Sequence, residues 1–597
     1  MLPKDTRNLV ELFFDQAASF GDKPFLWRKQ DGKYRALTWA DTADAVARLA
    51  RALVAEGIQS GDRIVLVSEN RPEWLIADMA IMAAGGVTVP AYTTNTTGDH
   101  QHILENSEAR GAILSTARLA QQFLPAAHQS DALDFVIAME PPKVSQSINA
   151  RILDWDTVIG AQTVDPEDMR ETAGTIGRED TACLIYTSGT GGAPKGVRIH
   201  HGGILHNCAG ACEVLREIGL RNNVFLSFLP LSHAYEHSAG QALPIAIGAQ
   251  IYYAEGIDKL AVNMEEARPT IMVVVPRLFE MLRNRVLRQI EKGGPARRKL
   301  FEQALALGIR KFRNGGHLPL HLALQDRLLD RLVRAKIRRK FGGRIKALVS
   351  GGAPLNPEVG EFFIGLGLPL LQGYGQTESS PIVSVNRPSA PKMHTVGPPM
   401  QGVDVSIAED GEILVRGELV MQGYWRDKSS TADTIREGWL HTGDVGHIDE
   451  NGHLVITDRK KDIIVSDKGE NISPQRVEGM LSLEPEIAQV MVYGDRKPYL
   501  VGLLVPDTEW LAQWAKETGK PADLAAVHDD PALRGALDEA VARVNRRLSG
   551  IERVRRFRIA REPFSIENEQ MTPTMKVRRH VLCADYGDAL DNLYHKG

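Results

Sequence analysis

The chain has 597 residues, of which 43 % are hydrophobic and 24 % are charged, with 54 Gly and 31 Pro. This composition is typical of a folded globular protein and excludes disordered, collagen-like and membrane-spanning classes. At about 100–200 residues per domain, the length implies several domains. The net charge of −4 gives no overall field that would recruit nucleic acid, so an anion site must be built locally.

The cysteines and the N-terminus bear on the compartment. The cysteines are Cys183, Cys208, Cys212 and Cys583. They form no CxxC pair, and they fit a reducing compartment and packing roles. Charges interrupt the apolar run that a signal peptide would need, and Asp78 and Pro90 interrupt the best membrane-span candidate at 75–92. We interpret 75–92 as a buried helix followed by a strand, and we expect a cytoplasmic protein.

From residue 37 the pattern alternates between helices and strands. It predicts, in chain order, a helix over 38–56, a strand over 63–68, a helix after Pro72 and a strand over 87–91. Short β-branched runs recur at 182–186, 250–253, 271–275 and 345–349. The alternation predicts an α/β fold, and the recurring runs predict that the sheet continues over several hundred residues.

After about residue 390 short strands and tight turns predominate, as at 411–417 and 451–457. They predict a β-rich subdomain over about 390–459. We therefore expect a large N-terminal domain of layered α/β subdomains over 1–459, which includes this β-rich part. A small, mobile α+β C-terminal domain over 460–597 completes the predicted fold.

One segment is strongly basic. Residues 277–344 contain 19 Lys and Arg against 5 Asp and Glu, a local charge of +14. Within it, 320–341 has the apolar spacing of an amphipathic helix. The apolar residues at this spacing are Leu324, Leu328, Leu329, Leu332, Val333, Ile337 and Phe341. One interpretation is that this stripe docks into the core; the other is that a basic face rests on anionic lipid, as a peripheral membrane contact.

The most informative stretch is 186–197, Tyr-Thr-Ser-Gly-Thr-Gly-Gly-Ala-Pro-Lys-Gly-Val, which follows an apolar strand. Its glycines, hydroxyls and Lys195 can surround phosphate oxygens with N–H groups and a cation. The Walker A motif is absent because Lys195 follows Pro194, and Pro194 also breaks a Gly-x-Gly-x-x-Gly pattern. The stretch therefore indicates a phosphate loop of another kind.

Other clusters are weaker individually. Residues 372–378, Gln-Gly-Tyr-Gly-Gln-Thr-Glu, combine a flexible backbone, an aromatic ring and a carboxylate, which suits a purine, a phosphate and Mg²⁺. Small residues at 350–354 can receive a flat base. The turn at 438–444 presents a carboxylate suited to ribose hydroxyls, and 458–462 adds cations. Each alone is equally compatible with a plain turn or a solvated charge run.

In their order along the chain, these clusters resemble the core motifs of the adenylate-forming enzymes. The matching segments are 187–196, 229–233, 372–378, 438–444, 458–462 and 572–576. The variants at 229–236, 268–280 and 458–464 are most similar to the long-chain fatty acid–CoA ligase branch. The resemblance implies that a carboxylate attacks the α-phosphate of ATP with Mg²⁺ present, releasing pyrophosphate, and that CoA then takes the acyl group from the adenylate.

The resemblance also implies residue roles. Lys576 would place a cation between the reacting anions, Glu378 with Thr190 would hold Mg²⁺, and His233 would lie between the nucleotide and acyl pockets. Tyr374 would stack on adenine, and Asp444 and Arg459 would bind ribose. The remaining implied nucleotide or CoA contacts are Thr187, Ser188, Gly189, Gly191, Gly192, Lys195, Gly352, Ala353, Gly373, Gly375, Gln376, Thr377 and Gly469. Lys461 aligns with the family's hinge, and segments 234–247 and 272–282 would line the acyl tunnel.

Two departures from the family pattern stand out. Gly191 replaces a usual threonine in the phosphate loop, and the stretch from His200 lacks the usual asparagine after His201. Alternatives remain: an enzyme that loads a carrier protein or accepts a medium-chain or aryl acid, and an inactive fatty-acid-binding scaffold. A serine hydrolase is set aside because the chain has no Gly-x-Ser-x-Gly elbow.

Overall fold

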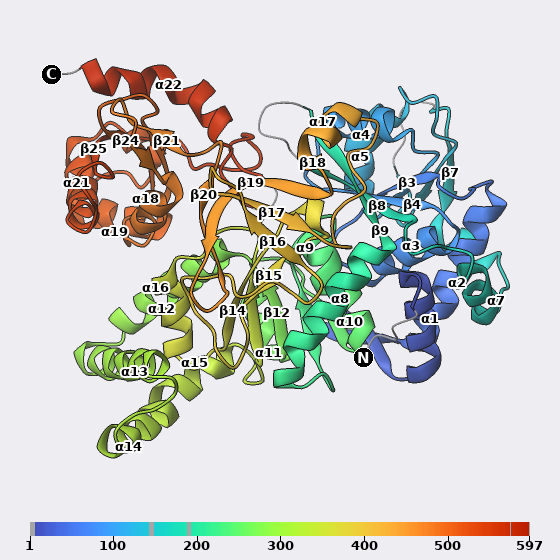
Figure 1. Cartoon of the computed structure of the whole chain (residues 1–597), viewed down its shortest axis with the longest axis horizontal. Helices are drawn as coiled ribbons and strands as arrows, with labels where there is room; N and C mark the ends of the chain where they lie inside the picture. Colours follow the sequence, from blue (N-terminus) through green and yellow to red (C-terminus); the bar gives the residue numbers. More distant parts are fainter. Residues whose placement is uncertain (1–5, 143–147, 188–192, 573–574, 596–597) are drawn as a thin grey trace.

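The computed structural model describes residues 6–142, 148–187, 193–572 and 575–595. A large N-terminal domain carries a smaller C-terminal domain at one end, and the two touch along one side (Figure 1). Most of the phosphate loop, 188–192, lies outside the described residues, so the predictions for Ser188, Gly189, Thr190, Gly191 and Gly192 are not addressed by the structure.

The first sheet has the strand order β7-β6-β5-β3-β4-β8-β9. Its strands are β3 (Arg63–Val67), β4 (Val87–Ala91), β5 (Gly111–Leu114), β6 (Phe135–Ala138), β7 (Arg151–Asp154), β8 (Thr181–Thr187) and β9 (Lys195–His200). All neighbours are parallel except β8 and β9, which are antiparallel. Ile64 and Leu66 pack on one face and Val65 and Val67 on the other, so helices cover both faces of the sheet.

The helices around the first sheet follow the predicted alternation. They are α1 (Leu9–Phe20), α2 (Trp39–Ala55), α3 (Pro72–Ala83), α4 (Thr97–Ser107), α5 (Ala117–Ala127), α6 (Trp155–Gly160), α7 (Pro166–Ala173) and α8 (His201–Leu215). A capping box between Thr38 and Asp41 starts α2 and satisfies its first N–H groups. The helix and strand predicted within 75–92 are confirmed as α3 and β4. No helix in the described part of the chain is both long and apolar enough to cross a membrane.

The second sheet has the strand order β15-β14-β13-β12-β10-β11-β1-β2. Its strands are β1 (Pro24–Gln30), β2 (Lys33–Thr38), β10 (Val224–Ser227), β11 (Gln250–Tyr253), β12 (Ile271–Val274), β13 (Ala347–Ser350), β14 (Leu370–Tyr374) and β15 (Ser384–Val385). The predicted strands are therefore confirmed. The prediction that they continue a single sheet is wrong, because β8 joins the first sheet while β10 to β14 belong to the second. Local sequence predicts that a segment is a strand, whereas the sheet it joins depends on which distant segments of the chain pair with it.

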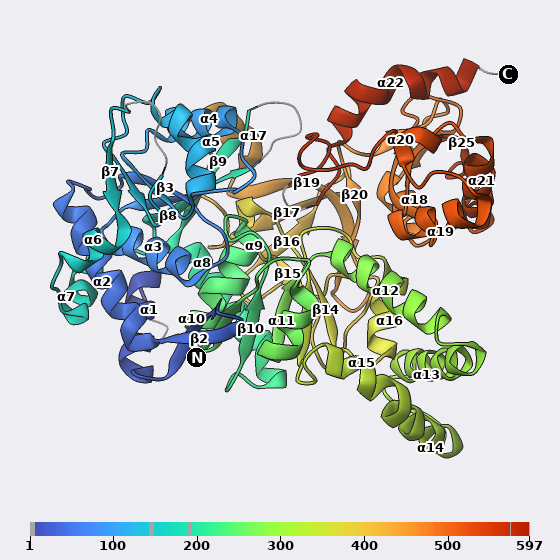
Figure 2. The same cartoon turned by 180° about the vertical axis from the view of Figure 1, so that it is seen from behind.

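The helices of the second sheet include a long basic region. They are η1 (Arg216–Ile218), α9 (Ala234–Glu236), η2 (His237–Ala242), α10 (Leu243–Ile247), α11 (Leu260–Ala267), α12 (Pro276–Glu291), α13 (Pro295–Arg313), α14 (Leu320–Leu329), η3 (Asp330–Arg334), α15 (Ala335–Lys340), α16 (Pro357–Gly365) and η4 (Thr377–Ser379). Both views show α13 and α14 projecting from the domain, with α14 at the tip (Figures 1 and 2).

The predicted docking of the 320–341 stripe is half correct. Leu329 and Phe341 are buried, and Val333 and Ile337 pack against the core cluster that contains Phe341. Leu324, Leu328 and Leu332 instead point outward, with 75 %, 58 % and 44 % of their surfaces exposed. A stripe of this width cannot all face one neighbour, and the packing of the projecting helices decides which half is covered.

A β-rich subdomain follows, as predicted. It contains β16 (Asp404–Ile407), β17 (Glu412–Arg416), β18 (Ile435–Arg436), β19 (Trp439–Ile448) and β20 (Leu454–Arg459), with α17 (Lys428–Thr434) beside them. The C-terminal domain contains β21 (Ile464–Val465), β22 (Asn471–Ile472), β23 (Ile487–Tyr493), β24 (Leu500–Pro506) and β25 (Val554–Ile559), with α18 (Pro474–Leu481), α19 (Thr508–Thr518), α20 (Leu524–Val527), α21 (Pro531–Asn545) and α22 (Arg579–His595). Its own core includes residues from β23, β24, α21 and α22.

The cysteines pack as predicted, except for one. Cys183, Cys208 and Cys212 are buried, whereas Cys583 is half-buried and lines the cavity described below. All four are free thiols.

Candidate active site

A cavity of about 1760 Å³ lies where the second sheet, the β-rich subdomain and the C-terminal domain meet. The predicted site residues that line it are Thr187, Lys195, His233, Gly352, Ala353, Gly373, Tyr374, Gly375, Gln376, Thr377, Glu378, Asp444, Arg459, Lys461 and Lys576. They come from segments separated by hundreds of residues. The sequence motifs therefore converge on one site.

The carboxyl end of β14 and the loop after it form one wall. A Cβ at Gly375 would overlap the carbonyl oxygen of Pro381, so only glycine allows these loops to approach so closely. On the neighbouring strand, a Cβ at Gly351 would lie 2.8 Å from the Tyr235 ring. At both positions protein atoms occupy the space that a side chain would take, so these glycines permit close packing, and a flat base at 350–354 stays a prediction.

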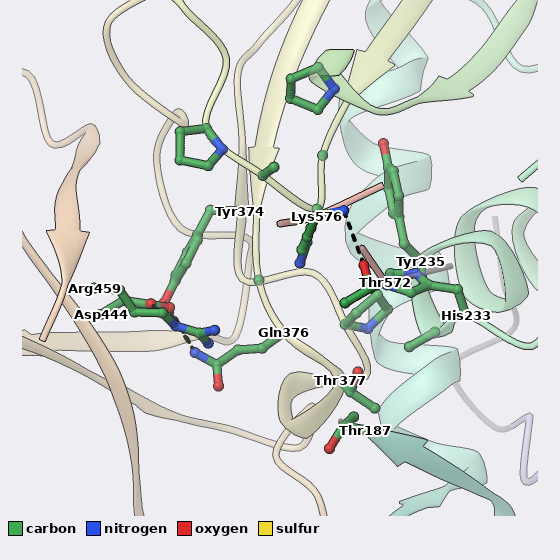
Figure 3. A pocket seen from close by; sticks show the side chains of 18 of the residues that line it. Thr187, His233, Tyr235, Tyr374, Gln376, Thr377, Asp444, Arg459, Thr572 and Lys576 are labelled. Carbon is green, nitrogen blue, oxygen red and sulfur yellow. Dashed lines mark hydrogen bonds and ion pairs between the residues drawn. The ribbon is translucent and has the colours of Figure 1, made fainter. Parts of the chain in front are cut away.

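Asp444 is the centre of a hydrogen-bonded group. It is buried, and its Oδ2 accepts hydrogen bonds from the Tyr374 hydroxyl at 2.7 Å and from Gln376 Nε2 at 2.9 Å. Its Oδ1 accepts from Arg459 Nε at 3.0 Å. Burial and the Asp444 charge raise the pKa of the Tyr374 hydroxyl, which keeps it a neutral donor. Figure 3 shows these side chains gathered on one side of the cavity.

Strands β19 and β20 hold this group together. Asp444 pairs directly with Arg459 in the antiparallel register, so the two side chains are cross-strand neighbours. The sequence motifs at 438–444 and 458–462 are thus two sides of one hairpin. The fixed register prevents Arg459 from leaving the carboxylate.

Lys195 and Glu378 occupy a second part of the cavity, joined by Tyr424. The Tyr424 hydroxyl donates to Glu378 Oε1 at 2.9 Å, and the Lys195 ammonium lies 5.3 Å from the centre of the Tyr424 ring. Lys195 also donates to Ser430 Oγ and lies 3.4 Å from Asp427 Oδ2. Sequence reasoning missed Tyr424, because it is 46 residues from Glu378 and outside every motif.

Lys576 enters the cavity from the C-terminal domain. Met571 and Val577 form an antiparallel bridge, and the Lys576 N–H donates to Thr572 Oγ1 at 3.1 Å, so Lys576 stands at the end of a tight loop. In Figure 3 it lies between Tyr374 on one side and Tyr235 and His233 on the other. Its side chain is exposed to the open cavity, and desolvation by the surrounding protein, followed by the charge of Arg459, lowers its pKa to about 8.

His233 also lines the cavity. Burial, followed by the charge of Lys576, lowers the pKa of His233 to about 3, so the imidazole is neutral at physiological pH. Its Nδ1 accepts from the Tyr235 N–H at 3.2 Å, which assigns the ring proton to Nε2. His233 is thus a fixed neutral donor rather than a cation.

The cavity also has apolar walls. They include Ala211, Val214, Leu215, Phe225, Ala239, Leu243, Ile271 and Val273. Both predicted acyl-tunnel segments contribute residues, and α8 contributes a wall that the sequence analysis did not identify. Gly469 is the predicted site residue that, within the described residues, does not line this cavity; it forms the turn between β21 and β22 with a φ of +81°.

Ion pairs hold the C-terminal domain in this position. Arg288 of α12 donates to Asp507 at 2.7 Å, and Arg547 pairs with Glu358. Asn356 Nδ2 donates to the carbonyl oxygen of Gly479 at 3.1 Å. These contacts join the two domains in the position in which Lys576 lines the cavity.

Comparison with known proteins identifies this arrangement. Residues 13–425 match the model of the AMP-binding enzyme family, and residues 461–597 match the model of the AMP-binding enzyme C-terminal domain. The chain belongs to the AMP-binding enzyme family. The adenylate-forming enzymes predicted from the motifs are this family, and the predicted fold class, a large α/β domain with a smaller C-terminal domain, is confirmed.

Several AMP-binding enzymes match over nearly the whole chain. The long-chain-fatty-acid–CoA ligase FadD15 of Mycobacterium bovis is 34 % identical over 99 % of this chain and 97 % of its own length. Long-chain-fatty-acid–CoA ligase 5 of Rattus norvegicus is 29 % identical over 99 % of this chain and 89 % of its own. The adenylation domain of a carboxylate reductase from Mycobacterium chelonae has a TM-score of 0.76 at 21 % identity, covering 100 % of this chain and 92 % of that one. This last likeness shows the fold alone.

Proposed function

We propose that this AMP-binding enzyme is a long-chain fatty acid–CoA ligase that forms an acyl adenylate from ATP and then an acyl-CoA. The observation that carries the proposal is the position of Lys576, which lines one cavity together with Asp444, Glu378 and a set of apolar side chains. Relatives of almost the same length are named long-chain-fatty-acid–CoA ligases, which supports the substrate class.

The nucleotide would occupy the polar part of the cavity. Adenine would lie along 351–353 and 373–375 with Tyr374 against it, and Asp444 with Arg459 would bind the ribose hydroxyls. Gln376 holds Asp444, and Thr377 extends the same wall toward the phosphates. Thr187 and Lys195, at the two ends of the phosphate loop, would hold the β- and γ-phosphates together with Ser188–Gly192.

Glu378 fits a Mg²⁺ ion at the phosphates. Its carboxylate faces the cavity with Oε1 held by Tyr424. Mg²⁺ is usually bound through one or two carboxylates plus phosphate oxygens, so a single oriented carboxylate is a suitable donor set. Together with the Thr190 hydroxyl it would hold the ion, which would neutralise phosphate charge.

In the first step, a carboxylate oxygen of the acid attacks the α-phosphorus, the bond to the bridging oxygen breaks, and pyrophosphate leaves with that electron pair. Both reactants are anions, so their approach needs a cation, and the Lys576 ammonium would supply it. The neutral His233 would orient the acid through its Nε2–H. In the second step the CoA thiolate attacks the acyl carbon and AMP leaves.

Thioester formation requires a different domain position. We propose a boundary at 459/460 and a hinge at Lys461, about which the C-terminal domain turns after the adenylate has formed. Lys576 would leave the cavity and Gly469, outside the cavity in the present position, would line the pantetheine entrance. The Arg288–Asp507 contact would open during this movement.

A cytoplasmic location and peripheral contact with the inner face of a membrane belong to the same proposal. A long-chain acid is held in lipid, and the basic segment 277–344, with its local charge of +14, is suited to an anionic surface.

The test is pyrophosphate release with ATP and Mg²⁺ across acids of increasing chain length, with and without CoA, while AMP is quantified. A maximum with a long chain, with continuous turnover only when CoA is present, would support the proposal. Turnover that does not respond to CoA would favour a carrier-protein acceptor, and a maximum with aryl or medium-chain acids would change the substrate. Release at background with every acid would favour the inactive scaffold.

A further inference from the structure

The outward face of α14 carries a row of exposed leucines. Leu320, Leu324, Leu328 and Leu332 are 87 %, 75 %, 58 % and 44 % exposed. They are spaced four residues apart, so they lie next to one another along the helix surface. Single exposed leucines are ordinary, but a continuous row at the tip of the projecting hairpin formed by α13 and α14 marks an interaction surface.

The acidic and basic side chains around this row of leucines differ in their exposure. The acidic residues of α14 and η3 are paired: Asp326 is buried and pairs with Arg334 and Lys311, and Asp330, whose side chain is 38 % exposed, pairs with Arg338 at 2.7 Å. The exposed charged residues of 320–340 are all cations. They are Arg327, Arg331, Lys336, Arg339 and Lys340, all exposed, and none of them has an ion-pair partner within the described residues.

Cations and leucines share one face. Arg327 and Arg331 follow Leu324 and Leu328 by three residues, so each arginine lies beside a leucine on the same side of the helix. A surface-bound amphipathic helix combines these features: apolar side chains enter the acyl boundary while adjacent cations meet anionic headgroups. A protein partner would need a concave surface complementary to this projecting tip. A lipid surface needs only an acyl layer that the leucines can enter and anionic headgroups that the arginines can meet.

We infer that the leucine row of α14, with Arg327 and Arg331, is the face by which the enzyme binds an anionic lipid surface. The inference rests on the proposed function, since a long-chain acid would be collected from such a surface. It assigns the contact to one helix face rather than to the basic segment as a whole. The other cations of 277–344 would act at a distance and bring the hairpin to the membrane.

The test is co-sedimentation of the full-length protein with vesicles of phosphatidylcholine alone or mixed with phosphatidylglycerol. We expect binding to the mixed vesicles only, weakened by salt. Leu324→Ser combined with Leu328→Ser should lower the partition coefficient by about tenfold or more, because each leucine removed from water contributes strongly. Arg327→Gln combined with Arg331→Gln should lower binding and flatten its dependence on salt.

Val54→Ser is the matched control, because Val54 is 44 % exposed on α2, at the opposite end of the molecule; this variant should bind like the wild type. The inference is overturned if the wild type ignores anionic vesicles or if the leucine variant binds as well as the wild type. It is also overturned if, without lipid, the wild type dimerises and the leucine variant does not, since the face would then join two copies.

Thioester formation from an acid dispersed in detergent separates this inference from the proposed function. The leucine variant should retain that activity while losing vesicle binding. Vesicle binding without any ligase activity would leave the lipid contact standing and remove the proposed function.

Discussion

Lys576 offers the sharpest test of the catalytic geometry. Replacing it with methionine keeps the length and most of the volume of the side chain but removes the cation from the cavity. The loop that carries Lys576 is held by backbone contacts of Thr572, Met571 and Val577, so the variant should fold normally. The change therefore isolates the charge.

The size of the effect follows from what the cation does. A preorganised donor at developing negative charge contributes about 2.7–4 kcal/mol, so adenylate formation should fall by about 10²–10³. The pH dependence follows from the pKa of about 8: the ammonium is about 90 % charged at pH 7 and about 10 % charged at pH 9. Because the charged form is the active one and is lost as pH rises, kcat/KM should fall about tenfold over this interval.

Two half-reactions are measured separately. Adenylate formation is followed by pyrophosphate release, and thioester formation is followed from a supplied acyl adenylate and CoA. Lys576→Met should lose adenylate formation and keep thioester formation. The fall of kcat/KM for adenylate formation above pH 8 should be absent from the residual activity of this variant. Lys516→Met, on the exposed surface of α19, is the matched control. Equal losses in both half-reactions, or an unchanged pH dependence in the variant, would refute the role assigned to Lys576.

Three further predictions concern the walls of the cavity and the contact between the domains. Asp444→Asn should raise KM for ATP by about tenfold to a hundredfold, because charge-assisted hydrogen bonds contribute about 1.5–3 kcal/mol; isothermal titration with ATP would show the loss, and unchanged affinity would contradict it. Arg288→Gln should slow adenylate formation by about fivefold, or roughly 1 kcal/mol for a partly exposed pair with Asp507, without slowing thioester formation; stopped-flow measurement of both steps decides. Gly375→Ala should destabilise the protein by roughly 1–3 kcal/mol through overlap with the Pro381 carbonyl, and calorimetry should show a lower Tm.

Local sequence predicted most of the elements because their signals are local. The capping box at Thr38, the apolar period of α2 and the apolar run of α3 after Pro72 need no knowledge of the rest of the chain. The phosphate-loop stretch was also found, because its glycines, hydroxyls and lysine suit phosphate oxygens, whereas the roles of the other motif residues came from the resemblance to the adenylate-forming enzymes. The cavity brings them together as the resemblance implied, except for Gly469, which lies outside it, and 188–192, which lie outside the described residues.

Tertiary structure decided what depends on distant neighbours. The division of the strands into two sheets, the contact of Tyr424 with Glu378, and the low pKa of Lys576 arise between segments that the chain order does not relate. The same holds for the leucines of 320–341: periodicity shows that they share a helix, but only the packing of the projecting hairpin determines which of them meet the core and which meet solvent. Periodicity is a property of the helix alone, whereas burial depends on what the rest of the protein places beside it.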